Sequence, residues 1–306
     1  MDTMRQEILE IPLRARDIWN ATLDVNLPMH VPYLGMGSSY FASLAFKYMG
    51  IPIIPEIASE YFNYICLKKQ PLGVILSQSG RSSEALWCTS LFEKYIAISN
   101  DPNSKLCTSP SVKDIIPLLA GKEENSSSKT YINTLVALFK GFGMDPTPEL
   151  YLLGNNMEMY DERGLSLADR IYDFLQKEKI HGIYILGSGP NTATALEAAL
   201  ILSESTKLNF HGLPMPQYDH GPKETAKNSI VIQILSKGKS YERAVKLSET
   251  IAAAGAHVFT VEETEAREEF SILNNIVPFN FMAYYLSKKL NVKEIFSVGG
   301  KVTEVS

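Results

Sequence analysis

Residues 31–40 read Val-Pro-Tyr-Leu-Gly-Met-Gly-Ser-Ser-Tyr, and residues 182–191 read Gly-Ile-Tyr-Ile-Leu-Gly-Ser-Gly-Pro-Asn. Each stretch begins as an apolar strand, turns at glycine and continues into an alanine-containing sequence that favours a helix. The same order of signals recurs about 150 residues later, which indicates an internal repeat. Strands that alternate with helices in this way predict an α/β fold with parallel sheets flanked by helices.

A later strand in each half ends in a polar turn. Residues 73–84 read Gly-Val-Ile-Leu-Ser-Gln-Ser-Gly-Arg-Ser-Ser-Glu, and residues 230–242 read Ile-Val-Ile-Gln-Ile-Leu-Ser-Lys-Gly-Lys-Ser-Tyr-Glu. Both turns contain Leu-Ser, then a glycine, then a serine. The elements that we expect to follow are helices over 85–94 and 243–254 and strands over 95–99 and 257–261.

Between the halves, residues 141–148 carry enough glycine and proline to end a helix. The sequence therefore predicts two tandem domains, 1–150 and 151–306, each a flavodoxin-like sandwich. The first strand of each domain should be preceded by a helical segment, at 1–25 and at 160–178. Beyond the second domain's helices, a tail contains Gly299 and Gly300, which predicts a backbone that closely approaches its neighbours.

The chain has 306 residues, of which 45% are hydrophobic and 21% charged, and its formal net charge is −5. This composition excludes a disordered or collagen-like chain, and the negative charge gives no general attraction for nucleic acid or an anionic membrane. The 3 cysteines lack the spacing of a zinc site or a disulfide framework. The sequence has neither the apolar core of a signal peptide nor a run long enough to span a membrane. We therefore expect a cytoplasmic protein without a metal or other cofactor.

Six polar side chains follow two strands that should be neighbours in the first half. Ligands of parallel α/β sheets bind at the carboxyl ends of the strands, where helix N-termini offer unpaired N–H groups. Hydroxyl and amide donors beside glycines suit a phosphate monoester, and they let an acidic protein hold an anion. The alternative is that these serines only cap helices. The six residues are Ser38, Ser39, Ser77, Gln78, Ser79 and Ser82.

Gly35 and Gly37 also begin the pattern of a dinucleotide-binding turn, with Glu56 about 20 residues further on. The third glycine of that pattern is missing, since Tyr40 and Thr192 stand there in the two halves. The serine-rich second turn is foreign to a nicotinamide fold, and the chain has no P-loop sequence. A phosphate monoester is therefore favoured over a dinucleotide.

The second half carries candidates for acid–base chemistry. Glu197 and Glu204 are seven residues apart in a sequence expected to be helical, so they share one face about two turns apart. His220 lies in a proline-containing stretch, 215–222, that we expect to be an irregular loop. Either carboxylate can instead belong to a solvated or ion-paired helix face, and His220 can be a loop histidine bonded to the backbone.

Together these motifs resemble the tandem sugar isomerase (SIS) domain family, in particular the isomerase half of glucosamine-6-phosphate synthases and the SIS-type glucosamine-6-phosphate deaminases. The resemblance extends from about Val31 to Glu304. The sequences that carry it are Glu56-Ile-Ala-Ser-Glu60, Ser77-Gln-Ser-Gly80, Ser127-Ser-Lys-Thr130, Ala195-Leu-Glu-Ala-Ala-Leu200 with Glu204, His220-Gly-Pro222 and Lys301-Val-Thr303.

The resemblance implies that the first half binds the substrate, a phosphorylated amino sugar. In the family, the serine turns hold the sugar phosphate, which assigns that role to Ser39 and to the donors at 77–82. Ser38, beside Ser39 in the first turn, and Ser127, in the Ser127-Ser-Lys-Thr130 motif, are also expected at the substrate.

The resemblance also implies a catalytic set. Glu204 would move a proton between C1 and C2 of the sugar, and Glu197 would support the site. His220 would open the sugar ring and, in the family, comes from the partner subunit, which implies a homodimer with a shared active site. Lys301 in the tail would form a Schiff base with the open-chain ketose.

Three positions depart from the family pattern. Ile201 stands where the family helix has a lysine, and Gln217 and Asp219 replace the usual glutamate and lysine before the histidine. The loss of these charges is expected to bear on the pKa of Glu204 or on the accepted sugar. The segment before Lys301, residues 293–300, also lacks the family's proline and arginine.

The sequence begins directly with the SIS-like region, so we expect no glutaminase domain and favour deamination, most simply glucosamine 6-phosphate to fructose 6-phosphate and ammonia. One alternative is a related phosphosugar isomerase or deglycase, or a synthase-like isomerase that lacks its glutaminase domain. Another is a non-catalytic regulator that binds sugar phosphates. Glu204, His220 and Lys301 together favour an enzyme, because a regulator has no need for all three.

Overall fold

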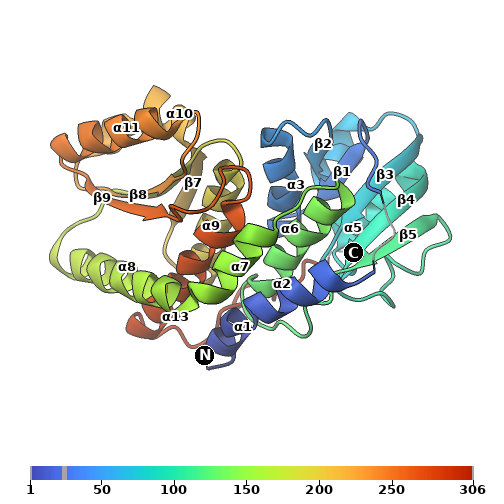
Figure 1. Ribbon diagram of the computed structural model, residues 1–306, viewed down its shortest axis with the longest axis horizontal. Helices are drawn as coiled ribbons and strands as arrows, with labels where there is room; N and C mark the ends of the chain where they lie inside the picture. Colours follow the sequence, from blue (N-terminus) through green and yellow to red (C-terminus); the bar gives the residue numbers. More distant parts are fainter. Residues whose placement is uncertain (1, 23–25, 305–306) are drawn as a thin grey trace. The chain divides into compact units, whose positions relative to one another are not determined.

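A computed structural model describes residues 2–22 and 26–304 (Figure 1). The described chain divides into two compact units. The amino-terminal unit contains residues from 10–146 together with the tail from residue 296 onward. The carboxyl-terminal unit contains residues 2–9 together with 147–295. Each unit has its own parallel sheet, so the predicted α/β fold with parallel sheets flanked by helices is confirmed.

The sheet of the amino-terminal unit has five parallel strands in the order β2-β1-β3-β4-β5. This is a flavodoxin-like order, in which the chain winds to both sides of the first strand. It creates a topological switch point between β1 and β3, the place where such sheets bind ligands. The strands are β1 (Pro32–Gly35), β2 (Ile54–Ile57), β3 (Gln70–Leu76), β4 (Phe92–Ser99) and β5 (Val112–Pro117).

Helices cover this sheet because β1 and the second half of β3 are apolar and buried. Helices α2 and α3 both pack on α6, and the short α4 packs on α5. The core beside α4 and α5 contains Leu34, Ile75 and Phe92. The helices are α2 (Ile11–Asn20), α3 (Ser38–Tyr48), α4 (Ala58–Glu60), α5 (Ser83–Cys88) and α6 (Lys129–Gly141), with short turns η1 (Tyr61–Ile65) and η2 (Thr89–Leu91).

The carboxyl-terminal unit repeats the first four positions of this plan, with parallel strands in the order β7-β6-β8-β9. Figure 1 shows α11 and α8 on opposite sides of its sheet. The strands are β6 (Ile183–Gly187), β7 (Phe210–Pro214), β8 (Ile230–Leu235) and β9 (His257–Glu262). The helices are α1 (Asp2–Leu9), α7 (Thr147–Asn155), α8 (Met157–Lys177), α9 (Asn191–Thr206), α10 (Met215–His220), α11 (Tyr241–Ala253), α12 (Ile272–Asn275) and α13 (Val277–Lys289), with the turn η3 (Pro222–Thr225).

The first glycine turn serves the same purpose in both units. A Cβ on Gly35 would lie 2.8 Å from the carbonyl carbon of Ser39, and a Cβ on Gly187 would lie 2.0 Å from the carbonyl oxygen of Asn191. Only glycine lets the strand end this close to the helix that follows it. The repeat in the sequence therefore reports a repeated packing requirement.

Three local expectations are wrong. The helix expected over 85–94 ends at Cys88, and β4 begins at Phe92, whose buried ring fills the space above Gly73. The loop expected around His220 is the helix α10, whose first turn accepts Pro216 because a proline there loses no helical hydrogen bond. Gly299 and Gly300 approach nothing closely; they adopt φ values of +84° and +85°, which glycine tolerates best.

The two units differ from the predicted ranges 1–150 and 151–306 at both ends of the chain. Helix α1 packs on α13, which places the first residues with the second half. The tail bonds to residues of the first half, where the Ser83 N–H donates to the Thr303 carbonyl at 3.1 Å. As domain boundaries, the ranges stay predictions.

Candidate active site

The switch point of the amino-terminal unit carries both predicted polar turns. Ser38 and Ser39 begin α3 directly after β1, and the serine turn, residues 77–82, follows β3. Because β1 and β3 are paired in parallel, their carboxyl ends meet at one edge of the sheet. The structure therefore brings the six predicted phosphate donors to one place.

The serine turn is closed by its own backbone. The Ser77 N–H donates to the Ile98 carbonyl at 3.0 Å, and the Gly80 N–H donates to the Ser77 carbonyl at 3.1 Å. Gly80 has a φ of +60°, and a Cβ there would lie 2.0 Å from the Ser104 hydroxyl. Both constraints require glycine at this position, so the turn has a fixed shape.

The donors of this turn remain available to a ligand. Within residues 2–22 and 26–304, the backbone N–H groups of Gln78, Ser79 and Ser82 donate to no backbone carbonyl, nor do they donate to a side chain. The Ser82 side chain makes no capping hydrogen bond to α5, although Ser82 is the N-cap residue. Helix capping therefore does not account for Ser82. The turn presents neutral donors of the kind that bind phosphate.

Glu123 organises the start of α6, next to the predicted Ser127. Its carboxylate accepts the backbone N–H groups of Ser128 at 3.0 Å and Thr130 at 3.2 Å, and it also accepts the hydroxyls of both residues. The Glu123 side chain is 0% exposed. Ser127 is half-buried, with its hydroxyl 3.2 Å from that of Thr130. A carboxylate at the N-terminus of a helix is stabilised by the helix dipole.

Lys301 returns from the tail to this same carboxylate. Its ammonium donates to the Glu123 carbonyl at 2.8 Å and the Asn125 carbonyl at 2.6 Å, and it lies 3.4 Å from the Glu123 carboxylate. These three contacts hold the Lys301 side chain at the start of α6, so the amine must leave them before it can reach a substrate.

The tail also contacts the serine turn. The Ser83 N–H, at the start of α5, donates to the Thr303 carbonyl, and the Arg81 guanidinium lies 3.9 Å from the Glu304 carboxylate. The chain from 301 to 304 therefore runs between the end of the serine turn and the start of α6. The structure brings the predicted lysine and the predicted phosphate donors together in the amino-terminal unit.

The two predicted carboxylates lie on α9 in the carboxyl-terminal unit. Glu197 is 0% exposed, which excludes a solvated helix face for it, and Glu204 is half-buried. Ile201, between them, is buried as well. Helix α9 ends at Thr206. The next residue, Lys207, has a φ of +65°, and its ammonium donates to the Glu204 carbonyl at 2.9 Å.

His220, the last residue of α10, is exposed, and it has no hydrogen-bond partner among the described residues. The alternative of a histidine bonded to the backbone therefore lacks support. Its neighbour Asp219 pairs with Arg243 at 2.8 Å and with Lys223 at 3.0 Å. Hydrogen bonds from Arg243, then from Lys223, lower the pKa of Asp219 below its ordinary value. The pair with Arg243 ties α10 to α11, and the pair with Lys223 ties it to η3, while the imidazole of His220 is exposed.

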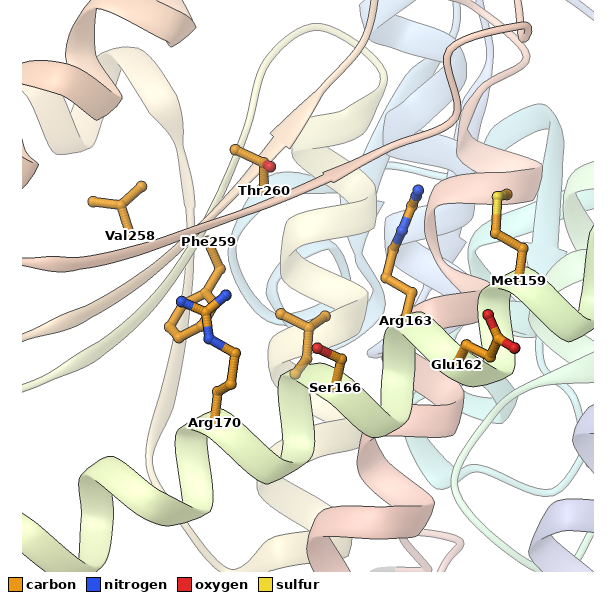
Figure 2. Close-up of a pocket in the computed structure, with 9 residues that line it drawn as sticks. Met159, Glu162, Arg163, Ser166, Arg170, Val258, Phe259 and Thr260 are labelled. Atoms are coloured by element: carbon orange, nitrogen blue, oxygen red, sulfur yellow. The ribbon is translucent and has the colours of Figure 1, made fainter.

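A hollow of about 450 Å³ lies between α8 and β9 in the carboxyl-terminal unit (Figure 2). Arg163 donates to the Glu262 carbonyl at 2.6 Å, and the Arg170 guanidinium lies 4.5 Å from the centre of the Phe259 ring. Its lining contains none of the predicted site residues. Since β9 is the edge strand of this sheet, we attribute the hollow to that uncovered edge and not to the predicted site.

The described residues contain no group of three or more histidine, cysteine, aspartate or glutamate side chains arranged to hold a metal ion. Within the same residues, no helix combines the length and apolar character needed to cross a membrane.

No family model matches the chain. It is 26% identical to an isomerising glutamine–fructose-6-phosphate aminotransferase of Methanothermobacter thermautotrophicus, over 93% of this chain and 54% of the relative. The chain thus spans about half the length of that curated relative.

Solved structures show the same arrangement of elements. The C-terminal domain of glucosamine-fructose-6-phosphate aminotransferase from Francisella tularensis matches with a TM-score of 0.75 at 20% identity, covering 94% of this chain and 96% of that one. This chain has the same fold as that domain. The glucosamine-6-phosphate deaminase of Thermotoga maritima matches with a TM-score of 0.73 at 18% identity, covering 94% of both chains. These matches support the predicted likeness to sugar isomerase domains.

Sequence reasoning missed Glu123 as a site residue. Its signal was an acidic residue five positions before Ser128 in a stretch that begins a helix, a pattern that suits a capping carboxylate. Lys129 was part of a quoted motif without a role; its buried ammonium pairs with Glu10 at 2.6 Å. That partner is more than a hundred residues away, so no local pattern could reveal it.

Proposed function

We propose that this chain is an enzyme of the phosphosugar isomerase type that deaminates glucosamine 6-phosphate to fructose 6-phosphate and ammonia. The observation that carries the proposal is the return of Lys301 to the start of α6, with the tail also bonded to Ser83 at the end of the serine turn. Phosphate donors and an amine thus belong to one unit. The likeness to aminotransferases and a deaminase that act on hexose 6-phosphates supports the substrate class.

The phosphate would bind the serine turn and the start of α3. Ser39, Ser77, Ser79 and Ser82 offer hydroxyls, Gln78 offers an amide, and the open N–H groups of the turn add backbone donors. These donors are neutral, so they hold the dianion without a surface field of positive charge. Ser38 and Ser127 would contact the same ligand from α3 and α6.

The reaction requires a proton transfer, a nitrogen exchange and a hydrolysis. Glu204 would take the proton from C2 of the open-chain aldose and return it to C1, which leaves an imine at C2. The neutral amine of Lys301 would add to C2 and expel ammonia, forming a Schiff base. Water then releases fructose 6-phosphate and restores the lysine, so the balance is one substrate and one water for one ketose and one ammonia.

Glu123 would hold that lysine away from the sugar until the tail moves. In the resting structure its carboxylate lies 3.4 Å from the Lys301 ammonium. Movement of the tail, eased by the conformational freedom of Gly299 and Gly300, would take the amine from these acceptors to the sugar.

His220 would open the sugar ring, and Glu197 would support Glu204 from the buried side of α9. The exposed imidazole, at the end of a helix that surface ion pairs hold, suits a group offered to another copy of the chain. We therefore include in the proposal a homodimer in which each subunit completes the other's site.

Ile201 favours a second candidate, an isomerase or deglycase that acts on a different phosphosugar. This position is buried and apolar, whereas the related sugar isomerase helices carry a lysine there. Loss of a cation near Glu204 changes which substituent the site accepts, because a buried charge must find a partner.

The test is ammonia release from glucosamine 6-phosphate by the full-length protein. Glucosamine serves as the control that lacks the phosphate, and we expect no release from it. Binding of glucosamine 6-phosphate without ammonia release would contradict deamination. Other phosphorylated amino and ketoamine sugars are assayed in the same way, and turnover of one of these would establish the second candidate instead.

A further inference from the structure

The carboxyl-terminal unit has its own switch point, between β6 and β8. The lysine turn, residues 236–240, follows β8 there, in the position that the serine turn has after β3. It contains Lys237 and Lys239, both exposed, and the Tyr241 N–H closes it by donating to the Gly238 carbonyl at 3.2 Å. A glycine turn with two lysines beside the start of α9 has the character of an anion site.

The carboxylate of Glu268 already occupies this turn. A Cβ on Gly238 would lie 1.9 Å from the Glu268 carboxyl carbon and 2.0 and 2.2 Å from its two oxygens. The carboxyl group therefore fills the space directly above Gly238. The cavity that remains measures about 10 Å³ and is lined by Ser188, Asn191, Ser236, Ser240 and Glu268 among others. A space of this size holds about one water molecule and excludes a phosphate.

Hydrogen bonds fix the backbone of Glu268 at the switch point. The Ser271 hydroxyl donates to the Glu268 carbonyl at 2.8 Å and accepts from the Asn191 amide at 2.8 Å, at the first residue of α9. The Asn275 amide donates to Asn191 at 3.3 Å and to the Leu235 carbonyl, at the end of β8, at 3.4 Å. The segment is thus bonded to the elements that follow β6 and end β8.

One donor at this place has no partner. The Ser188 hydroxyl oxygen is buried in the cavity wall and makes no hydrogen bond among the described residues. A buried hydroxyl without a partner costs free energy, and natural sites tolerate it where a ligand uses the group.

We propose that Glu268 is a built-in anion that closes the lysine turn to phosphate, and that removing its carboxylate converts the turn into a phosphate site. The chain then binds its substrate's phosphate only at the serine turn, a consequence that rests on the proposed function. The ligand class of the opened turn is a phosphate monoester or inorganic phosphate, because the position corresponds to the serine turn and carries two lysines.

The test measures inorganic phosphate binding to the full-length protein by titration calorimetry. Glu268→Ala is compared with the native chain and with Glu269→Ala, which removes the same charge one residue away. We expect Glu268→Ala to gain one site and the control to gain none, with at least about a tenfold difference in affinity for that site. No gain in Glu268→Ala overturns the proposal. A native chain that binds no phosphate while Glu268→Ala binds one equivalent upholds it and contradicts the proposed function.

Discussion

The two switch points share their construction and differ in what returns to them. In each unit a glycine turn after the first strand brings a helix close, and a polar turn follows the neighbouring strand. A later segment then comes back to each place. In the amino-terminal unit it is the tail, which brings the cation of Lys301; in the carboxyl-terminal unit it is the segment after β9, which brings the anion of Glu268.

The comparison shows how two units with the same strand order can differ in whether their switch point is open to a ligand. Strand order and glycine turns are set by packing, so they persist in both units. The polar groups at the turn decide whether a ligand can enter, and neutral donors remain open at the serine turn while a carboxylate fills the lysine turn. Under the proposed function, the carboxyl-terminal unit would supply other groups, Glu204 on α9 and His220 on α10.

The largest effect that would break this comparison is expected at Lys301. Lys301→Ala should lower turnover of glucosamine 6-phosphate about a thousandfold or more, because no other amine takes its place. Binding of the sugar phosphate should be kept, since the serine turn is unchanged. Turnover is measured by ammonia release, and binding by calorimetry.

Lys293→Ala is the matched control, because it removes the same charge from an exposed residue shortly before the tail. Its turnover should equal that of the native chain. Near-native turnover in Lys301→Ala would refute the Schiff-base role and leave the tail a structural part of the amino-terminal unit.

A smaller effect is expected from paired serine substitutions. Ser79→Ala removes a donor from the open turn and should raise the KM for the sugar phosphate about tenfold or more, with a smaller change in kcat. Ser236→Ala removes a hydroxyl from the lysine turn, where Ser236 follows β8 as Ser77 follows β3, and it should leave the KM within about twofold. Equal increases in KM in both variants would mean that phosphate reaches both turns, which would contradict the proposal that Glu268 closes the lysine turn.

The sequence predicted the parts of this fold that follow local patterns. The strands beginning near 31, 73, 182 and 230 are apolar runs that end in glycine or serine, so period and turn chemistry identified them. Strand β2 was missed because its four residues are only partly buried and show no alternation. The end of α5 was wrong because Phe92 and Gly73, on neighbouring strands, fit together in space, and no local pattern reports that fit.

The site was predictable where one turn carries it and not where distant segments meet. Ser77, Gln78, Ser79 and Ser82 are read from six consecutive residues. Lys301 pairs with Glu123, and the Glu268 carboxyl group fits above Gly238. In both cases the partner lies in a distant part of the sequence. Such contacts depend on the folded sheet, so the capping role of Glu123 and the closing role of Glu268 required the structure.

The smallest effect is expected from the side chains that hold the tail in one unit and α10 in the other. The carboxylate of Glu123, which binds Lys301, is fully buried, whereas Asp219, beside His220, has a quarter of its side chain exposed. Asp219→Asn removes the ion pairs to Arg243 and Lys223, so it should lower the melting temperature at pH 7 by only about 1–2 °C, as for a partly exposed pair. The pKa of Asp219 is lowered in the folded state, so its stabilisation is complete above the ordinary value of 3.8 and is lost as the pH falls through the lowered pKa. The difference between the two proteins, measured by thermal unfolding, should therefore vanish toward pH 2, and a difference that persists there would show that packing, and not charge, holds α10 in place.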